Sequence, residues 1–291
     1  MTSYRLAVVG GGNMGAALVG GLLQAGWPAA DIAVVEVLTA RAEQLREMFP
    51  GVAVTDTIPA CQAALIAVKP YDVAAACTSA AAAGATRLLS IAAGIPLSAL
   101  QEAAGPDVAV VRSMPNTPAL VGEGAAAIAG GSTADDADLA WAESILGSVG
   151  LVVRVPERQL DAVTGLAGSG PAYIFLVAEA LMDAGVLAGL SRADSEALTT
   201  QLLVGSAALL RERGEPARLR TQVTSPGGTT AAGLRVLEEH AVRSAFLEAG
   251  WDRRKVTAGD TVELVFDAGD EAGELALQVG PQQAHLHGML E

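Results

Sequence analysis

A glycine-rich turn between an apolar segment and a helix-like segment constrains the fold more than any other feature of this sequence. The turn GGGNMG covers residues 10–15, after the apolar run 5–9 and before the helix-like run 16–24. This order fits G-x-G-x-x-G, in which the glycines allow a tight turn, close approach of a pyrophosphate and close helix–strand packing. The helix N-terminus adds free N–H groups and a positive dipole end. The turn predicts a Rossmann domain with cofactor contacts from Gly10, Gly12, Asn13, Met14 and Gly15.

The second strand ends at an acidic residue, which argues against the alternative of a glycine-rich turn that holds no ligand. Residues 32–35 form the strand, and Glu36 follows, 21 residues after Gly15. A carboxylate at this position accepts hydrogen bonds from the adenosine ribose and repels a 2′-phosphate. Glu36 therefore favours NADH over NADPH. Arg41 is either a solvated helix charge or a partner for a phosphate.

Strands and helices continue to alternate after Glu36. Further strands are expected at 63–68, 87–91, 108–111, 125–129 and 151–155, with a helix over 135–146. In a doubly wound sheet, ligands bind beyond the carboxyl ends of the strands. The residues expected at the nicotinamide end are Lys69, Ala93, Gly94, Met114, Pro115 and Asn116. Lys69, one of only two lysines, is expected to support the cofactor or the strand end electrostatically.

The second half of the chain has helical periodicity and no strand signal between residue 156 and about residue 250. Helices are expected from GSGPAY to residue 187, from a Ser191 cap to residue 213, over 216–222, and over 230–238. Three glycines within these helices indicate close packing, and the apolar character indicates a symmetric dimer, with a self-contained monomer as the alternative. The predicted domains are a Rossmann domain over 1–155, a helical domain over 156–249 and an atypical tail over 250–291.

Length, net charge and cysteine content limit the classes of partner and the cellular location that we expect. The chain has 291 residues, half of them hydrophobic, which suits about two domains. A net charge of −14 disfavours nucleic acid and anionic membrane surfaces as partners. The uncharged stretch 6–30 is interrupted by glycines and a proline, so we expect neither a spanning helix nor a signal peptide, and a cytoplasmic location. Cys61 and Cys77 form no metal-ligand pattern and are expected to be buried thiols.

Few histidine, lysine and tyrosine side chains are placed to donate a proton in the reaction. No histidine precedes His240 and no lysine lies between Lys69 and Lys255, while Tyr173 is best interpreted as a packing residue. Reduction of a ketone requires a proton donor, but an imine is already protonated or nearly so. The turn TSPGGTT, residues 224–230, has no acid or base, yet it precedes a helix and could bind a carboxylate through backbone N–H groups. The alternative is an ordinary interhelical turn with a threonine cap.

Six motifs in order carry a family resemblance: GGGNMG, AVKP, SIAAG, RSMPNTP, GSGPAY and TSPGGTTAAGL. Together they resemble pyrroline-5-carboxylate reductase over roughly residues 4–249. The resemblance implies NADH- or NADPH-dependent reduction of 1-pyrroline-5-carboxylate to L-proline, with a helical domain that interlocks with a partner subunit in a dimer or larger homo-oligomer. It implies substrate contacts from Gly168, Ser169, Gly170, Pro171, Ser225, Pro226, Gly227, Gly228, Thr229 and Thr230, with Thr230 near the imine nitrogen as the catalytic residue. It also implies cofactor contacts from the glycine turn 10–15 and from Ala67, Val68, Lys69, Pro70 and Asn116.

The chain departs from that family at two places. Many members have Asn-Arg or Ser where this chain has Glu36-Val37. The likeness to the family stops at Ala249. In the remaining tail, His285 and His287 are better interpreted as part of a flexible end than as metal ligands, so no metal is expected. The alternative functions are reduction of another cyclic imine acid and an inactive dinucleotide-binding homologue.

Overall fold

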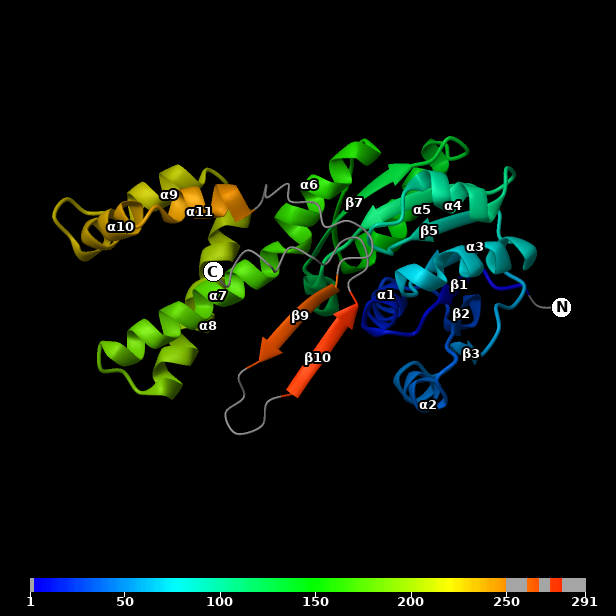
Figure 1. Cartoon of the computed structure of the whole chain (residues 1–291), viewed down its shortest axis with the longest axis horizontal. Coiled ribbons are helices and arrows are strands. Elements are labelled where there is room, and N and C mark those ends of the chain that lie inside the picture. Colours follow the sequence, from blue (N-terminus) through cyan, green and yellow to red (C-terminus); the bar gives the residue numbers. More distant parts are fainter. Residues whose placement is uncertain (1–2, 250–260, 267–272, 279–291) are drawn as a thin grey trace. The chain divides into compact units, whose positions relative to one another are not determined.

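The chain divides into two compact units in a computed structural model that describes residues 3–249, 261–266 and 273–278 (Figure 1). The first unit extends to Gly168 and the second begins at Ser169. The predicted domain boundary, between residues 155 and 156, lies ahead of this division, so the short helical segments after residue 156 belong to the first unit.

The first unit contains one eight-stranded sheet with the order β3-β2-β1-β4-β5-β6-β7-β8. Neighbouring strands are parallel except for β7, which runs antiparallel to β6. The predicted Rossmann fold is confirmed, and so is each predicted strand to within a few residues. The strands are β1 (Leu6–Val9), β2 (Ile32–Val35), β3 (Ala53–Thr55), β4 (Ala63–Ile66), β5 (Arg87–Ser90), β6 (Ala109–Met114), β7 (Gly124–Gly130) and β8 (Gly150–Arg154).

Helices cover both faces of this sheet, which explains why its parallel strands are apolar throughout. Leu6 and Val8 of β1 belong to one buried cluster, and Ala7 and Val9 belong to the other. The helices are α1 (Asn13–Gln24), α2 (Thr39–Met48), α3 (Val73–Ala82), α4 (Leu97–Ala104), α5 (Asp136–Leu146) and α6 (Leu160–Val163). Shorter 3₁₀ segments are η1 (Ala29–Asp31), η2 (Pro70–Asp72), η3 (Thr117–Val121), η4 (Gly147–Val149) and η5 (Glu157–Gln159), and η6 (Thr164–Gly168) is a π-helical turn.

The second unit is helical, as predicted. It consists of α7 (Gly170–Leu187), α8 (Arg192–Arg213), α9 (Pro216–Gln222), α10 (Thr229–Glu239) and α11 (Val242–Ala249). The backbone N–H of Asp194 donates to the Ser191 hydroxyl, so the predicted cap of α8 is confirmed. Of the three glycines, Gly185 confirms the expected close packing, because a Cβ there would lie 2.1 Å from the Ser195 hydroxyl, whereas a Cβ at Gly189 or Gly205 would meet nothing within 4 Å.

Much of the apolar surface of the second unit is uncovered within one chain. Phe175, Leu187 and Leu198 are each at least 60% exposed, and Ala178 is the only apolar residue buried among the described residues of this unit. The continuous helical segment 157–187 is also long and apolar enough, by length and composition alone, to cross a membrane. A single-chain bundle would bury such faces, so they agree with the predicted contact between copies of the chain.

Two features lie outside the main predictions. A separate two-stranded antiparallel sheet, β9 (Thr261–Phe266) and β10 (Gly273–Gln278), occurs in the segment that we expected to be an atypical tail. The pair His285 and His287 lies outside the described residues. Cys61 and Cys77 are free buried thiols as predicted, and burial raises the pKa of the Cys77 thiol to about 11.

Candidate active site

The glycine turn after β1 has the geometry that a pyrophosphate requires. Gly10 has a φ of 111°, and a Cβ there would lie 2.6 Å from the Ala67 carbonyl oxygen. A Cβ at Gly15 would lie 2.1 Å from the carbonyl oxygen of Gly10, so this helix can start here only without a side chain. Gly12 faces open space, which leaves its backbone accessible to a ligand. The structure therefore brings the predicted turn and the AVKP segment together, and both fit a dinucleotide.

Glu36 lies beside the same turn. Its carboxylate accepts hydrogen bonds from the backbone N–H groups of Gly11, at 3.2 Å, and Leu38, at 2.9 Å. Arg41 donates from Nε to the Gly11 carbonyl oxygen at 2.8 Å, so it is more than a solvated helix charge. An acidic and a basic side chain therefore hold Gly11 from two sides, at the place where the sugar next to the pyrophosphate binds in this fold.

Lys69 and Pro70 follow β4 at the carboxyl edge of the sheet, as predicted. Lys69 is exposed and precedes η2, and no ion pair within the described residues involves it. An exposed ammonium group with a free charge can attract an anionic cofactor, in line with its predicted electrostatic role.

The loop after β5 contains Ala93 and Gly94 and is tied to the neighbouring strand by buried serines. Ser113 of β6 donates its hydroxyl to the Ser90 carbonyl oxygen at 3.0 Å. The backbone N–H of Ala92 donates to the Ser90 hydroxyl at 3.3 Å. Gly94 has a φ of 81°, a conformation that favours glycine. No pattern in the sequence marks these two serines, because each looks like an ordinary strand residue.

Asn116 is held by the protein on both sides of its amide. Its Oδ1 accepts from the backbone N–H of Ala125 at 2.8 Å, and its Nδ2 donates to the Ala167 carbonyl oxygen at 3.0 Å. Next to Ala167, a Cβ on Gly168 would lie 2.8 Å from the Met114 Cε atom. The structure thus places the end of β6 against the start of the predicted substrate loop, and Asn116 has a structural role that the sequence did not suggest.

The GSGPAY segment spans an unusual helical junction. Residues 164–168 form the π-helical turn η6, and α7 begins at Gly170 with Pro171 in its first turn, as predicted. π-helical turns are rare and are frequent at functional sites. Ser169 makes no side-chain cap to α7.

The turn before α10 leaves a helix N-terminus uncapped. Gly228 is the N-cap residue and offers no side chain, and Gly227 has a φ of 68°. The Thr224 hydroxyl donates backwards to the Arg220 carbonyl oxygen at 2.6 Å, so the alternative of a threonine cap is wrong. Thr229 and Thr230 are exposed in the first turn, and their hydroxyl groups have no hydrogen-bond partner among the described residues. Free N–H groups and a hydroxyl together suit a carboxylate-bearing ligand.

The two predicted substrate loops do not meet within one chain. In Figure 1 the turn before α10 lies at the left end of the second unit, whereas α7 begins near the middle of the drawing. Helices α7, α8 and α9 separate them in sequence, and α10 and α11 lie between them in Figure 1.

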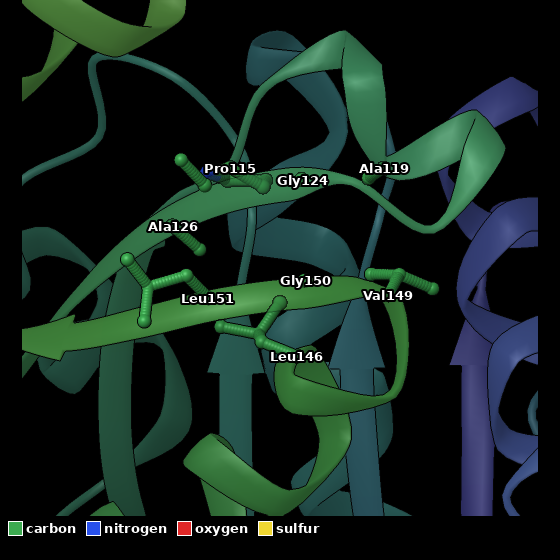
Figure 2. A pocket seen from close by; sticks show the side chains of 9 residues that line it. Pro115, Ala119, Gly124, Ala126, Leu146, Val149, Gly150 and Leu151 are labelled. Carbon is green, nitrogen blue, oxygen red and sulfur yellow. The ribbon is translucent and has the colours of Figure 1, made fainter. Parts of the chain in front are cut away.

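A small cavity lies near the end of β6 but cannot hold a substrate (Figure 2). It is lined mostly by apolar groups, among them Pro115 after β6, Ala119 of η3, Leu146 of α5 and Leu151 of β8. Its volume of about 10 Å³ leaves room for about one water molecule. The described residues also contain no group of three or more His, Cys, Asp or Glu side chains that could hold a metal ion.

Family models match both parts of the chain. Residues 157–256 match the model described as pyrroline-5-carboxylate reductase dimerisation, and residues 5–94 match NADP oxidoreductase coenzyme F420-dependent. A pyrroline-5-carboxylate reductase from Synechocystis is 43% identical over 254 residues, which cover 85% of this chain and 94% of the relative. The chain belongs to the pyrroline-5-carboxylate reductase family. The resemblance seen in the motifs is confirmed.

Further members of the pyrroline-5-carboxylate reductase family agree. The Mycobacterium tuberculosis relative is 41% identical over 270 residues, which cover 83% of this chain and 91% of the relative. The Coxiella burnetii structure has a TM-score of 0.80 at 33% identity and covers 86% of this chain and 95% of its own. The Plasmodium falciparum structure, with NADP bound, has a TM-score of 0.73 at 29% identity and the same coverage. The chain is therefore an oxidoreductase with a nicotinamide dinucleotide cofactor, and most of the region that matches the family's dimerisation model lies in its helical unit.

Proposed function

We propose that this chain reduces 1-pyrroline-5-carboxylate to L-proline and that the turn before α10 binds the substrate carboxylate. The observation that carries the proposal is the uncapped N-terminus of α10, with the exposed hydroxyl of Thr230 in its first turn. Such a helix end stabilises a negative charge by about 0.3–1 kcal/mol when exposed, and by up to about 2 kcal/mol when partly buried. The relatives named above are pyrroline-5-carboxylate reductases, and they do not favour the two alternative functions.

Among the residues that the structure describes, no side chain suited to act as a general acid lies at this turn, which fits an imine substrate. Tyr173 donates its hydroxyl to the Ala249 carbonyl oxygen at 3.4 Å. His240 is the C-cap residue of α10, so it lies about 15 Å along the helix axis from Thr230. When bound, the dinucleotide supplies the hydride. The chain then has only to orient the ring, bind its carboxylate and place the Thr230 hydroxyl near the imine nitrogen, because the iminium carries its own proton.

The substrate site requires more than one copy of the chain. The two predicted loops lie apart within the second unit, and the helices between them leave large apolar faces uncovered. A second copy that covers these faces can bring its own loop to the first copy's α7 start. This arrangement supports a homodimer as the smallest active form.

Glu36 supports NADH as the preferred cofactor. A 2′-phosphate would approach a carboxylate that is already fixed by the N–H groups of Gly11 and Leu38. Arg41 moderates this preference, because its guanidinium group lies at the same turn. A cytoplasmic location remains our prediction.

A turnover assay tests the proposed function. Purified protein is mixed with 1-pyrroline-5-carboxylate and NADH or NADPH, and cofactor oxidation is followed together with L-proline formation. We expect turnover, with a higher kcat/KM for this five-membered ring than for the six-membered homologue. Absence of turnover with both cofactors, alongside normal NADH binding, would instead identify an inactive homologue.

A further inference from the structure

Arg112 and Met114 of β6, together with Asn116 in the extended backbone just beyond it, hold one later segment of the chain. Alternate residues of an extended strand point to the same face. On this face Arg112 pairs with Glu157, Met114 contacts Gly168, and Asn116 bonds to Ala167. The segment 157–168 therefore lies along β6 and ends at the first residue of the predicted substrate loop.

The ion pair between Arg112 and Glu157 anchors the start of this segment. Arg112 Nη1 donates to Glu157 Oε1 at 2.9 Å, and the Arg112 side chain is only 11% exposed. Glu157 is held in place by its neighbours, since Val155 donates its N–H to the Ile128 carbonyl oxygen and Leu160 is fully buried. The guanidinium group is therefore shielded from water, while the Glu157 side chain is 35% exposed, so the pair is partly shielded.

The same carboxylate oxygen also caps helix α4. The backbone N–H of Leu97 donates to Glu157 Oε1 at 2.6 Å. Pro96, the N-cap residue of α4, provides no side-chain cap of its own. A carboxylate at a helix N-terminus satisfies a free N–H group and interacts favourably with the helix dipole. Glu157, which lies 60 residues after Leu97 in the chain, thus takes the place of a local N-cap.

The carboxylate connects two segments that both belong to the candidate active site. On one side it fixes the start of α4, and so the end of the loop that contains Ala93 and Gly94. On the other side it fixes the start of the segment that ends at Gly168. Neither segment could shift along the sheet edge without breaking a bond to Glu157.

We infer that the Arg112–Glu157 pair is a positioning element for catalysis, setting the place of Gly168 relative to the loop after β5. It touches neither substrate nor cofactor in this role. The inference rests on the proposed function, because it assigns the nicotinamide end to that loop and the start of the substrate loop to Gly168. Misplacement of a reacting group by about 1 Å can lower the rate by about 100-fold.

The main test is Glu157→Gln, which keeps an oxygen that can accept from Leu97 but removes the charge that faces Arg112. We expect kcat with 1-pyrroline-5-carboxylate to fall by about 10-fold or more, whereas the dissociation constant of NADH stays close to that of the unmodified protein. In hydrogen exchange, amides at 97–99 and 164–168 should exchange faster than in the unmodified protein, because the uncharged side chain is no longer held by Arg112 and bonds to Leu97 less often. Arg112→Lys, which keeps the charge, should retain most of the kcat, and Arg112→Met should match Glu157→Gln.

A matched control is Glu143→Gln. Glu143 accepts from Arg154 at 2.6 Å in an exposed ion pair of the same unit, so its loss should change neither kcat nor exchange at 97–99 and 164–168. The inference is overturned if Glu157→Gln lowers only the melting temperature and leaves kcat and the exchange pattern unchanged. If the unmodified protein itself shows no turnover, the proposed function fails, and the exchange at 97–99 and 164–168 alone then decides the positioning role.

Discussion

The substitution Glu36→Gln tests how this chain selects its cofactor. Glutamine has the same length, but its single amide oxygen can replace only one of the two carboxylate oxygens to which Gly11 and Leu38 donate. The change therefore removes a negative charge beside the glycine turn together with one of the two backbone hydrogen bonds to this side chain. The lost backbone bond affects both cofactors alike, so a change in the ratio of their dissociation constants reports the charge.

Two effects of this charge can be estimated. A like charge at about 4 Å costs about 1 kcal/mol in water and more where the site is partly buried, so NADPH should bind at least about 5-fold more tightly after the change. A charge-assisted hydrogen bond from the ribose becomes a neutral one, a loss of about 1 kcal/mol, so NADH should bind about 5-fold more weakly. The ratio of the two dissociation constants should shift by about 25-fold.

The assay is titration of NADH and NADPH by nicotinamide fluorescence, repeated as initial rates with both cofactors. Glu47→Gln is the matched control, because Glu47 is exposed on the neighbouring helix α2 and its change removes the same charge. Adding Arg41→Met to Glu36→Gln should reverse part of the gain in NADPH binding, since it removes the cation bonded to Gly11. A ratio that does not move, or an unmodified protein that strongly prefers NADPH, would show that Glu36 does not face the ribose.

Three further changes address the other parts of the site and the helical unit. Lys69→Met should raise the KM of the cofactor about 2- to 5-fold with little effect on kcat, and a loss of kcat at constant KM would point to a role in the transition state. Thr230→Ala should lower kcat/KM by about 3- to 150-fold while Thr230→Ser is much milder, and full activity of the alanine variant would mean that the carboxylate binds elsewhere. Gly185→Ala should destabilise the protein by about 1–3 kcal/mol in denaturant titration, because the new Cβ would lie 2.1 Å from the Ser195 hydroxyl; unchanged stability would show that α7 and α8 can separate freely.

Local patterns in the sequence were enough to predict the Rossmann fold and its turn. The glycines of GGGNMG act on neighbouring backbone, as the 2.1 Å approach of a Gly15 Cβ to the Gly10 carbonyl oxygen shows. Strand alternation and helix caps such as Ser191 are also local, so their periods and turn residues can be interpreted without tertiary structure. The short strand β3 escaped prediction because its three half-buried residues carry almost no periodic signal.

The sequence alone thus determined the fold class, the dinucleotide turn, the helical second unit and the family motifs, because each rests on residues close together in the chain. Only the tertiary structure decided which distant groups meet. The carboxylate of Glu157 gave no signal in the sequence, yet it joins Arg112 and Leu97, 45 and 60 residues away. Asn116 fits a cofactor motif, but its amide bonds to Ala125 and Ala167. Such contacts depend on the order of the strands in the sheet and on the antiparallel pairing of β7 with β6, which bring remote segments side by side. Local sequence periodicity carries no information about either.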